Sequence, residues 1–590
     1  MDNNFKNQQQ KVYPDPVIVR DMVLSSCAKH KDLPAFLVKE KNYKSPYHEI
    51  SYGQLEEDIV ALGAALIDAG FEGKKISVTG ENCYQWAVTY MAVMFGVGTI
   101  VSLDKELSKE EHFGLIERAD ISAIFFTEGF DGRFDELEHI AKYRLNRYVG
   151  AENPDDVLTF RGLIEAGKAL SQEKRDAYRQ KTIDENALAV MKFTSGTTGL
   201  SKGVMLSSRS IGIDILAMTN VFEVGPGDRT LSVLPLHHCF ESILGLLHML
   251  SRGVCIAESD GLKSLYKNLG EAKVTVILIV PLMVDSFYRT LNRNASKTGT
   301  EEDLQKRIDH YKAVRTSMNH VTEDGRFDDS EARAYASELF AEEWKLFGGH
   351  LKAFFTGAAP IESYIIERLS DIGIKVMQGY GMTEGGPLLT GTPFFSETYK
   401  KTNSVGPALE CGILAIDNPD KAGIGEIIWK SDSNMLGYYQ MPEKTAEVLR
   451  DGWYYSGDYG YLDEDGWLII TGRKNNLIVS RTGKNIFPEE LEFGLSRSAY
   501  IDELMVYGVD DEGRGGPIVS VQIRPAYEAI HEKLGADVTP EQVLELLTSE
   551  VEAFNETQPH YKKIRNVLIR DKEFIKTASK KIKRAENIKF

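Results

Sequence analysis

The segment from Phe193 to Gly203 gathers residue types that together bind phosphate. Glycines let successive backbone N–H groups converge on one anion, hydroxyl groups add donors, and an ammonium group offsets negative charge. The residues that supply these features are Thr194, Ser195, Gly196, Thr197, Thr198, Gly199 and Lys202. A strand-like apolar run leads into the cluster, which favours a phosphate-binding loop over a flexible Ser/Gly loop. No Gly-Lys-Ser/Thr string has the spacing of a Walker loop.

The string Thr-Ser-Gly-Thr-Thr-Gly-x-x-Lys-Gly at residues 194–203 resembles the signature of the adenylate-forming superfamily. This superfamily includes acyl-CoA synthetases, luciferases and the adenylation domains of peptide synthetases. Other motifs of the superfamily follow, and the resemblance extends from about Ser51 to Arg584. It is closest to long-chain fatty acyl-CoA synthetases, because of the string Val-Pro-Leu-Met-Val-Asp-Ser-Phe-Tyr at residues 280–288, the charged helical pattern after it and the absence of a Ser-Gly-Lys terminus.

The resemblance implies that two further loops hold the adenine and the phosphates of ATP. In the string Phe-Thr-Gly-Ala-Ala-Pro, small residues pack flat against the adenine base, namely Gly357, Ala358 and Ala359. In the second loop, the backbone and Tyr380 contact adenine, Thr383 contacts the α-phosphate, and Glu384 helps to hold Mg²⁺. This loop consists of Gln378, Gly379, Tyr380, Gly381, Met382, Thr383 and Glu384. A carboxylate suits the last role because Mg²⁺ prefers oxygen ligands beside phosphate.

The resemblance also assigns single residues to the ribose and to the acid. Asp458 ends a Trp-Tyr-Tyr-Ser-Gly-Asp string and can accept hydrogen bonds from both ribose hydroxyls. Arg473 should reach the ribose or the phosphates, although a lone Asp or Arg is ordinarily a solvated surface residue. In the Pro-Leu-His-His string at residues 235–238, the family alignment makes His238 the residue that lines the acyl pocket. His237 fits an ordinary hydrogen-bonded histidine equally well.

The C-terminal segment is expected to supply a catalytic lysine. The family pattern Ser-Gly-Lys-Ile-x-Arg places it at Lys581; Lys580 replaces the glycine, so the register rests on Ile582 and Arg584. The resemblance implies that this lysine stabilises charge during adenylation. It also implies that a small domain rotates between adenylation and thiol transfer about a hinge at Asn475, where relatives commonly have Asp or Lys. The loop facing the thiol channel comprises Gly483, Lys484 and Asn485. Without the upstream motifs, a basic solvated tail would be the preferred interpretation.

These assignments predict an ATP-dependent acid:thiol ligase, with ATP, a carboxylic acid and CoA as substrates and Mg²⁺ as cofactor. The acid first displaces pyrophosphate from ATP to form an acyl-AMP, and CoA then displaces AMP. A medium- or long-chain fatty acid is the expected substrate. Within this class, an aryl-CoA ligase and an enzyme that transfers the acyl group to an acyl carrier protein stay open as alternatives. Outside it, the alternatives are an inactive nucleotide-binding regulator and a P-loop NTPase, which would produce ADP and phosphate.

The elements that must position these residues alternate between short apolar runs and helical patterns. Strands are predicted at 76–79, 121–126, 188–193, 230–234, 274–280, 351–355 and 374–377. Together with helices such as the one predicted at 52–69, they indicate an α/β fold with mostly parallel sheets flanked by helices. Parallel sheets bind ligands beyond the carboxyl ends of their strands, and several of these strands run directly into a Gly/Ser/Thr cluster.

Two domains are expected, because a chain of 590 residues is too long for one hydrophobic core. Residues 1–474 should form a large ATP- and acid-binding domain with a helical insertion at about 292–345. Residues 475–590 should form a small mobile α+β domain. An apolar hairpin at 504–508 and 518–523, with helices at 488–497 and 540–554, indicates the composition of this domain.

Composition and charge exclude some classes of function and indicate where in the cell the protein is located. The net charge of −18 argues against binding nucleic acid through a general basic field. The five cysteines have no metal-ligand spacing, which favours a reducing cytosol. The N-terminal residues lack the apolar core of a signal peptide, and the apolar runs fall short of the roughly 20 residues that span a bilayer. We therefore expect a cytoplasmic protein without a transmembrane segment, and peripheral contact of the basic C-terminus with a membrane stays open.

Overall fold

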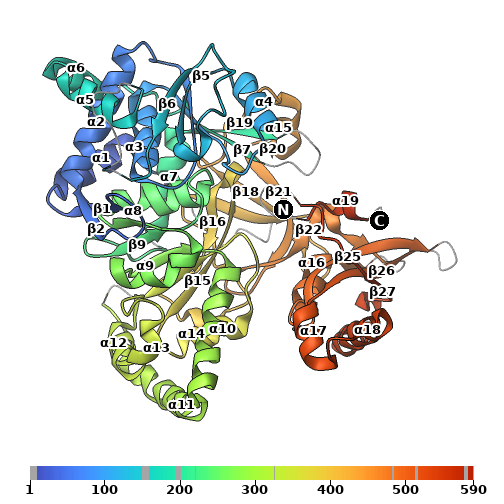
Figure 1. Cartoon of the computed structure of the whole chain (residues 1–590). Helices are drawn as coiled ribbons and strands as arrows, with labels where there is room; N and C mark the ends of the chain where they lie inside the picture. Colours follow the sequence, from blue (N-terminus) through green and yellow to red (C-terminus); the bar gives the residue numbers. More distant parts are fainter. Residues whose placement is uncertain are drawn as a thin grey trace.

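The computed structural model describes residues 10–588, apart from residues 149, 151–157, 195–200, 220, 324–325, 481–483, 512–515 and 577–581. Figure 1 shows a large body, formed by the N-terminal and central parts of the chain, and a smaller C-terminal lobe beside it. The body is α/β and the lobe is α+β, so the predicted fold class is confirmed.

A seven-stranded sheet forms one end of the body, with the strand order β19-β8-β7-β4-β3-β5-β6. Its strands are β3 (Lys75–Thr79), β4 (Thr99–Ser102), β5 (Ile121–Thr127), β6 (Ala141–Leu145), β7 (Leu188–Thr194), β8 (Lys202–Ser207) and β19 (Gly437–Tyr438). The five strands from β7 to β6 run parallel, whereas β8 runs antiparallel to β7. The strands predicted at 76–79, 121–126 and 188–193 are confirmed.

Helices precede or connect the strands of this sheet. They are α1 (Val19–Lys29), α2 (Tyr52–Asp68), α3 (Tyr84–Ala92), α4 (Lys109–Ala119), α5 (Phe160–Ala169), α6 (Gln172–Arg179) and α7 (Ser208–Met218). The helix predicted at 52–69 is confirmed as α2. Its first turn is capped by the Ser51 side chain, which accepts a hydrogen bond from the N–H of Gln54.

Two four-stranded sheets continue the body, with the orders β2-β1-β10-β9 and β11-β14-β15-β16. Their strands are β1 (Pro34–Lys39), β2 (Tyr47–Ser51), β9 (Arg229–Ser232), β10 (Cys255–Glu258), β11 (Val276–Ile279), β14 (Ala353–Thr356), β15 (Lys375–Met382) and β16 (Gly386–Gly391). β11, β14 and β15 are parallel, and β16 returns antiparallel to β15. The four remaining predicted strands are confirmed, but β15 extends further than predicted and includes most of the second adenine-binding loop.

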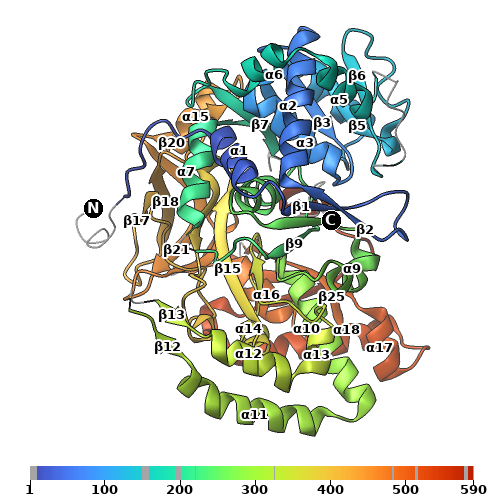
Figure 2. The same cartoon turned by 90° about the vertical axis from the view of Figure 1, so that its left-hand side faces the viewer.

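The elements between these strands are mostly helical. They are a π-helix, η3 (Phe240–His248), and the helices α8 (Met249–Ser251), α9 (Leu265–Ala272), α10 (Pro281–Thr298), α11 (Glu301–Met318), α12 (Ser330–Leu339), α13 (Ala341–Lys345) and α14 (Ser363–Ser370). The short strands β12 (His320–Val321) and β13 (Phe327–Asp328) form a hairpin between α11 and α12. Figure 2 shows α11 on the outer edge of the body. Asp329 anchors this helical region to the sheet, because its Oδ2 lies 2.9 Å from the buried Nζ of Lys375 in β15.

An antiparallel sheet that the sequence patterns do not predict precedes the C-terminal lobe. It contains β17 (Gly412–Asp417), β18 (Gly425–Ser431), β20 (Leu449–Arg450), β21 (Trp453–Leu462) and β22 (Leu468–Arg473), with α15 (Pro442–Val448) beside it. In the register of β21 and β22, Asp458 lies directly opposite Arg473. This sheet therefore sets the distance between two residues of the predicted nucleotide site.

The C-terminal lobe has an apolar core of its own, which includes Leu491, Val506, Val521 and Leu547. Its elements are β23 (Ile478–Val479), β24 (Asn485–Ile486), α16 (Pro488–Leu495), β25 (Ile501–Asp511), β26 (Gly516–Pro525), α17 (Tyr527–Leu534), α18 (Pro540–Glu556), β27 (Asn566–Ile569) and α19 (Arg584–Asn587). The predicted hairpin and the two predicted helices are confirmed as β25–β26, α16 and α18. Among the described residues, no helix combines the length and the apolar character that crossing a bilayer requires.

Candidate active site

The parallel strands β14 and β15 bring the two predicted adenine-binding loops together. A Cβ at position 357 would lie 2.9 Å from the carbonyl oxygen of Gly379, so glycine permits this close approach. The next residue, Ala358, has a φ of +69°, a left-handed conformation that a residue with a Cβ adopts at a cost of about 1 kcal/mol or more. Ala358 and Ala359 are exposed, so this turn presents only small side chains to solvent.

Hydrogen bonds and close backbone packing hold the second loop in place. The Gln378 amide donates hydrogen bonds to the carbonyl oxygens of Thr402 (2.8 Å) and Ser404 (2.9 Å). A Cβ at Gly381 would lie 2.2 Å from the carbonyl oxygen of Pro387, so the strand can pack this closely only with glycine there. After Met382 the chain turns through a 3₁₀ helix, Thr383–Gly385, before it returns as β16.

Tyr380, Asp458 and Arg473 form one polar cluster. The buried Tyr380 hydroxyl donates a 2.8 Å hydrogen bond to Oδ2 of Asp458, and Nε of Arg473 lies 3.3 Å from Oδ1. Burial and the neighbouring Asp458 raise the pKa of Tyr380 well above its usual value, so the phenol stays protonated and remains a donor. The structure thus joins Tyr380, which the sequence analysis assigned to adenine, Asp458, which it assigned to the ribose, and Arg473, which it assigned to the ribose or the phosphates.

Glu384 and Lys202 are linked through Tyr438, a residue that the sequence analysis missed. The Tyr438 hydroxyl donates a 2.9 Å hydrogen bond to Oε1 of Glu384, and the Lys202 ammonium lies 4.7 Å from the centre of the Tyr438 ring. Lys202 also pairs with Thr194 across β7 and β8. The other residues predicted to bind phosphate, Ser195, Gly196, Thr197, Thr198 and Gly199, lie outside the described residues.

The Pro-Leu-His-His loop approaches the same region from β9. His237 is largely buried, with Nε2 3.4 Å from Oδ1 of Asp104. Burial acts to raise the pKa of Asp104, but the adjacent His237 imidazole, together with a hydrogen bond from the N–H of Glu106, outweighs it and lowers the pKa to about 2. His238 is exposed and packs against the His237 ring. Cys239 follows, and its Sγ lies 3.2 Å from Oγ1 of Thr383.

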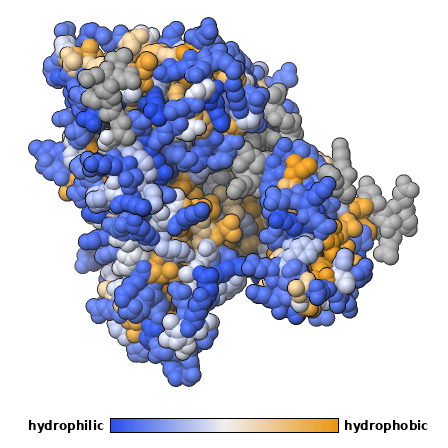
Figure 3. Space-filling view, viewed as in Figure 1, coloured by the Kyte–Doolittle hydropathy of each residue, from blue (hydrophilic) through white to orange (hydrophobic). Residues whose placement is uncertain are grey.

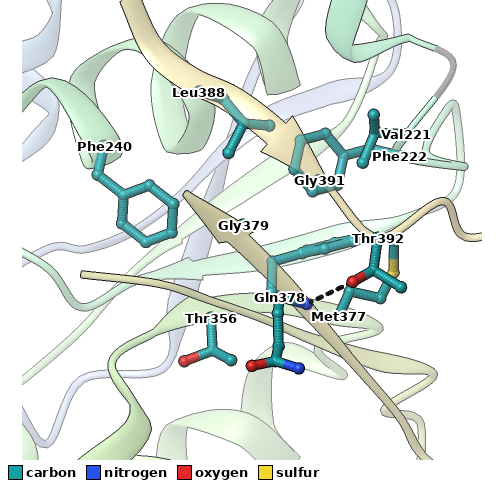
Figure 4. Close-up of a pocket in the computed structure, with 11 residues that line it drawn as sticks. Val221, Phe222, Phe240, Thr356, Met377, Gln378, Gly379, Leu388, Gly391 and Thr392 are labelled. Atoms are coloured by element: carbon teal, nitrogen blue, oxygen red, sulfur yellow. Dashed lines mark hydrogen bonds between the residues drawn. The ribbon is translucent and has the colours of Figure 1, made fainter. Parts of the chain in front are cut away.

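A small apolar cavity lies beside the second adenine-binding loop (Figure 4). It holds about one water-sized sphere, roughly 10 Å³. Its lining residues include Phe222, Phe240, Phe355, Gln378 and Gly379. Phe222 and Phe355 meet edge to face with ring centroids 4.2 Å apart, so aromatic side chains fill much of the space next to the loop.

Comparison with known proteins identifies the family. Residues 24–439 match the family model described as AMP-binding enzyme. The chain belongs to the AMP-binding enzyme family. The resemblance predicted from the motifs is therefore confirmed.

Relatives of this AMP-binding enzyme include long chain acyl-CoA synthetase 2 of Arabidopsis thaliana, which is 26% identical over 78% of this chain and 72% of the relative. A long-chain-fatty-acid–CoA ligase of Mycobacterium tuberculosis is 25% identical over 84% of this chain and 82% of the ligase. Among solved structures, o-succinylbenzoate CoA synthetase of Bacillus subtilis has a TM-score of 0.70 at 18% identity, covering 96% of this chain and 97% of that one. ATP-bound MatB of Rhodopseudomonas palustris has a TM-score of 0.71 at 21% identity, covering 96% and 98%. At these identities the structural likeness shows the fold alone.

The C-terminal lobe of this AMP-binding enzyme lies beside the site. Lys581 and Gly483 lie outside the described residues. Lys484 places its ammonium 4.5 Å from the centre of the Tyr561 ring, and Asn485 begins β24. Asn475 is the middle residue of a 3₁₀ turn, Lys474–Asn476, that directly follows β22. In the space-filling view, a hollow with apolar residues on its floor separates the lobe from the body on this face (Figure 3).

One ion pair connects the lobe to the body next to the first adenine-binding loop. Arg497 donates two hydrogen bonds to Glu362, from Nε to Oε1 (2.8 Å) and from Nη2 to Oε2 (2.6 Å). Glu362 lies shortly after the strained turn at Ala358, at the start of α14. Sequence reasoning missed this pair, because neither residue belongs to a motif and 135 positions separate them.

Proposed function

We propose that this AMP-binding enzyme is an ATP-dependent acid:thiol ligase that joins a medium- or long-chain fatty acid to CoA through an acyl-AMP. The observation that carries the proposal is the convergence of two clusters on the end of β15, Tyr380–Asp458–Arg473 and Glu384–Tyr438–Lys202. These clusters bring together a carboxylate that can accept hydrogen bonds from a ribose (Asp458), two cationic side chains that can bind phosphate (Lys202 and Arg473) and a second carboxylate (Glu384). The named long-chain acyl-CoA synthetases among the relatives support a fatty acid as the substrate.

In this proposal the nucleotide lies along the carboxyl ends of β14 and β15. Adenine packs against the turn of Gly357, Ala358 and Ala359, of which the two alanines are exposed, and is also contacted by Tyr380. Asp458 binds the ribose hydroxyls, because its carboxylate is held in place by Tyr380 and Arg473 and can accept further hydrogen bonds. Lys202, Thr194 and the hydroxyl residues that follow Thr194 in the sequence are proposed to bind the phosphates.

Glu384 is the residue proposed to hold Mg²⁺. Mg²⁺ is typically bound by one or two carboxylates together with substrate phosphates. A single half-buried carboxylate, oriented by the Tyr438 hydroxyl at 2.9 Å, fits that donor set. When bound, the ion would offset the negative charge of the phosphates.

The chemistry follows from the poor electrophilicity of a carboxylate. Its oxygen attacks the α-phosphorus of ATP, the bond to pyrophosphate breaks, and a mixed anhydride forms. Thr383 and Lys581 are proposed to stabilise the charge that builds on the α-phosphate, and such groups contribute roughly 3–4 kcal/mol each. The thiol of CoA then attacks the acyl carbon, and AMP leaves with the electron pair of the broken anhydride bond. Orientation of the thiol suffices for this step.

We further propose that residues 475–590 move as a unit relative to residues 1–474. Adenylation needs Lys581 at the phosphates, and thiol transfer needs the loop of Gly483, Lys484 and Asn485 beside the acyl group. The 3₁₀ turn that contains Asn475 supports a hinge there, because it is short and joins the last strand of the antiparallel sheet to the lobe.

An aryl-CoA ligase is the second candidate. The space beside Gly379 holds about one water-sized sphere and is lined by Phe222 and Phe355, so an acid of either class could enter it only if these rings moved. Two enzymes of similar fold are named for aromatic acids, o-succinylbenzoate and anthranilate.

The test is a screen for pyrophosphate release over fatty acids of graded length and over aryl acids, each with and without CoA. Release with fatty acids and acyl-CoA formation with CoA support the proposal; release with aryl acids alone favours the second candidate. Adenylate formation without transfer to CoA points to an acyl carrier protein as acceptor. ATP binding without any pyrophosphate release identifies an inactive regulator, and formation of ADP and phosphate identifies an NTPase. The Lys581→Ala variant should lose adenylation while it still binds ATP.

A further inference from the structure

A lysine that the proposed reaction does not use is buried behind the Pro-Leu-His-His loop. Lys192 lies in β7 and is 2% exposed. Its ammonium donates hydrogen bonds to Oγ of Ser102 (3.0 Å) and to the carbonyl oxygen of His237 (2.9 Å), and it lies 5.3 Å from the centre of the Tyr90 ring. Both acceptors are neutral, although burying an ammonium group is costly unless a charge compensates it. Desolvation accordingly lowers the pKa of Lys192 to about 7.

This lysine joins the phosphate-binding strand to the loop that carries His238. Lys192 stands two residues before Thr194, so the two side chains share one face of β7. The loop is also anchored by Asn82, whose amide donates to the Leu234 carbonyl oxygen (2.7 Å) and accepts from the Leu236 N–H (3.1 Å). Lys192 anchors the same loop to β7, the strand that leads into the predicted phosphate-binding loop.

The far end of the same loop reaches the second adenine-binding loop. Cys239 follows His238, and its Sγ lies 3.2 Å from Oγ1 of Thr383. A shift of the His237 carbonyl would therefore move His238 on one side and alter the Cys239–Thr383 contact on the other. The hydrogen bond from Lys192 sets where this loop lies relative to both phosphate-contacting segments.

We propose that Lys192 is a positioning residue, which holds the loop of residues 235–239 so that the acid carboxylate is aligned with the α-phosphate. The inference rests on the proposed function for the identity of the two reactants. The fixed loop itself does not depend on that function. Misplacement of a reacting group by about 1 Å can lower the rate on the order of 10²-fold. Loss of this anchor should therefore lower kcat/KM for the acid more than it changes the KM of ATP.

The test compares two full-length variants, Lys192→Met and the matched control Lys39→Met. Methionine keeps the length and apolar stem of lysine and removes the ammonium. Lys39 is also buried, at 1% exposed, but it lies in β1 and bonds to Glu271 (2.9 Å), away from the site. For each variant, the KM of the acid, the KM of ATP and kcat are measured by pyrophosphate release, and the melting temperature is measured separately.

We expect Lys192→Met to lower kcat/KM for the acid by about 10- to 100-fold with the KM of ATP nearly unchanged. Lys39→Met should leave kcat/KM for the acid and the KM of ATP nearly unchanged, even if it lowers the melting temperature as much as Lys192→Met does. The proposal would be overturned if kcat/KM for the acid were the same in Lys192→Met and in the unaltered protein. It would also be overturned if the two variants lost kcat/KM for the acid by the same factor. If Lys192→Met does not fold, Lys192→Gln, whose shorter amide cannot span to both acceptors, is compared in the same way.

A second readout needs no enzymatic activity. All five cysteines are free and buried, so the rate at which a thiol reagent labels each one reports local opening. In Lys192→Met, the thiol reagent should label Cys239 at least about tenfold faster than in the unaltered protein, whereas the labelling rate of Cys27, the internal reference, should not change. An unchanged rate at Cys239 contradicts the anchoring role. If the unaltered protein releases no pyrophosphate with any acid, the proposed function fails, while the labelling rate still decides whether Lys192 holds the loop.

Discussion

The phenol of Tyr380 donates a 2.8 Å hydrogen bond to the carboxylate of Asp458, although 78 positions separate the two residues. The bond connects the parallel sheet that carries the adenine-binding loops to the antiparallel sheet that carries the proposed ribose ligand. Arg473 holds the other carboxylate oxygen from the neighbouring strand. A carboxylate held from two sides can accept hydrogen bonds from a ribose without first being reoriented, and such preorganisation favours binding.

Replacement of Tyr380 by Phe should therefore weaken both the fold and nucleotide binding. A buried hydrogen bond to a charged group contributes about 1.5–3 kcal/mol, so the free energy of unfolding should fall by about that amount. The KM of ATP should rise by roughly tenfold, because Asp458 becomes free to turn. The measurements are urea unfolding and initial rates at varied ATP concentration.

Tyr84→Phe provides the matched control for this prediction. The Tyr84 hydroxyl donates a 2.9 Å hydrogen bond to buried Asp58, outside the candidate site. This variant should lose similar stability with an unchanged KM of ATP. A rise in the KM of ATP of equal size in both variants would show that general destabilisation, and not the orientation of Asp458, is responsible.

Glu384→Gln should reduce adenylate formation by about 10²- to 10³-fold, the usual effect of removing one charge-stabilising group. Glutamine can still accept the hydrogen bond from Tyr438, so the melting temperature should change little. The variant should also need more Mg²⁺ to reach half of its maximal rate, measured by a Mg²⁺ titration of pyrophosphate release. Tyr438→Phe, which keeps the carboxylate, should have a smaller effect. An unchanged Mg²⁺ dependence in Glu384→Gln would remove this residue from the metal site.

The Arg497–Glu362 pair should bias the orientation of the C-terminal lobe. Because the Arg497 side chain is 60% exposed, the pair contributes at most about 1 kcal/mol, which corresponds to a roughly fivefold change in populations. Arg497→Glu places two like charges together. The mean distance between two fluorescent labels, one on the lobe and one on the body, should therefore change in this variant. The double exchange Arg497→Glu with Glu362→Arg should restore the original distance. Failure of the double exchange to restore it would show that the pair does not act through charge.

Acidification below neutrality should destabilise the body through His112. This residue is 0% exposed, and burial together with the charge of Arg133 lowers its pKa from 6.5 to about 4. Above pH 6.5 neither the folded nor the unfolded state is protonated, so this stability is fully present there. It is lost as the pH falls from 6.5 towards 4, because the unfolded state takes up the proton first.

The predicted loss between pH 7 and pH 5 is about 2 kcal/mol from this histidine, measured by urea unfolding at the two pH values. His112 lies edge-on to Phe130 and Phe134, so His112→Phe fits the same cluster and should remove that part of the pH dependence. His139→Gln, at an exposed position, should leave the pH dependence as it is. The same pH dependence in His112→Phe and the unaltered protein would contradict the assignment.

Local sequence patterns predicted seven strands of the body, and the motifs predicted the residue types of the candidate site. Short β-branched runs ending in glycine or hydroxyl residues identified β7, β14 and β15, because strand propensity and turn chemistry act over a few neighbouring residues. The same patterns did not predict the antiparallel sheet of β17, β18, β20, β21 and β22, or the extension of β15 to Met382. Pairing between strands decides those features, and pairing depends on segments distant in the chain.

The residue types that can bind a nucleotide, and their order along the chain, were determined by the sequence alone. Glycines, hydroxyl residues and single charged groups keep their chemistry wherever they are placed. Only the tertiary structure decided which of them meet. Tyr438 reaches Glu384 across 54 positions and Cys239 reaches Thr383 across 144, and neither contact has a local signal. The burial of Lys192 behind His237 was decided in the same way, because the packing of whole strands and helices determines which polar groups lose their contact with water.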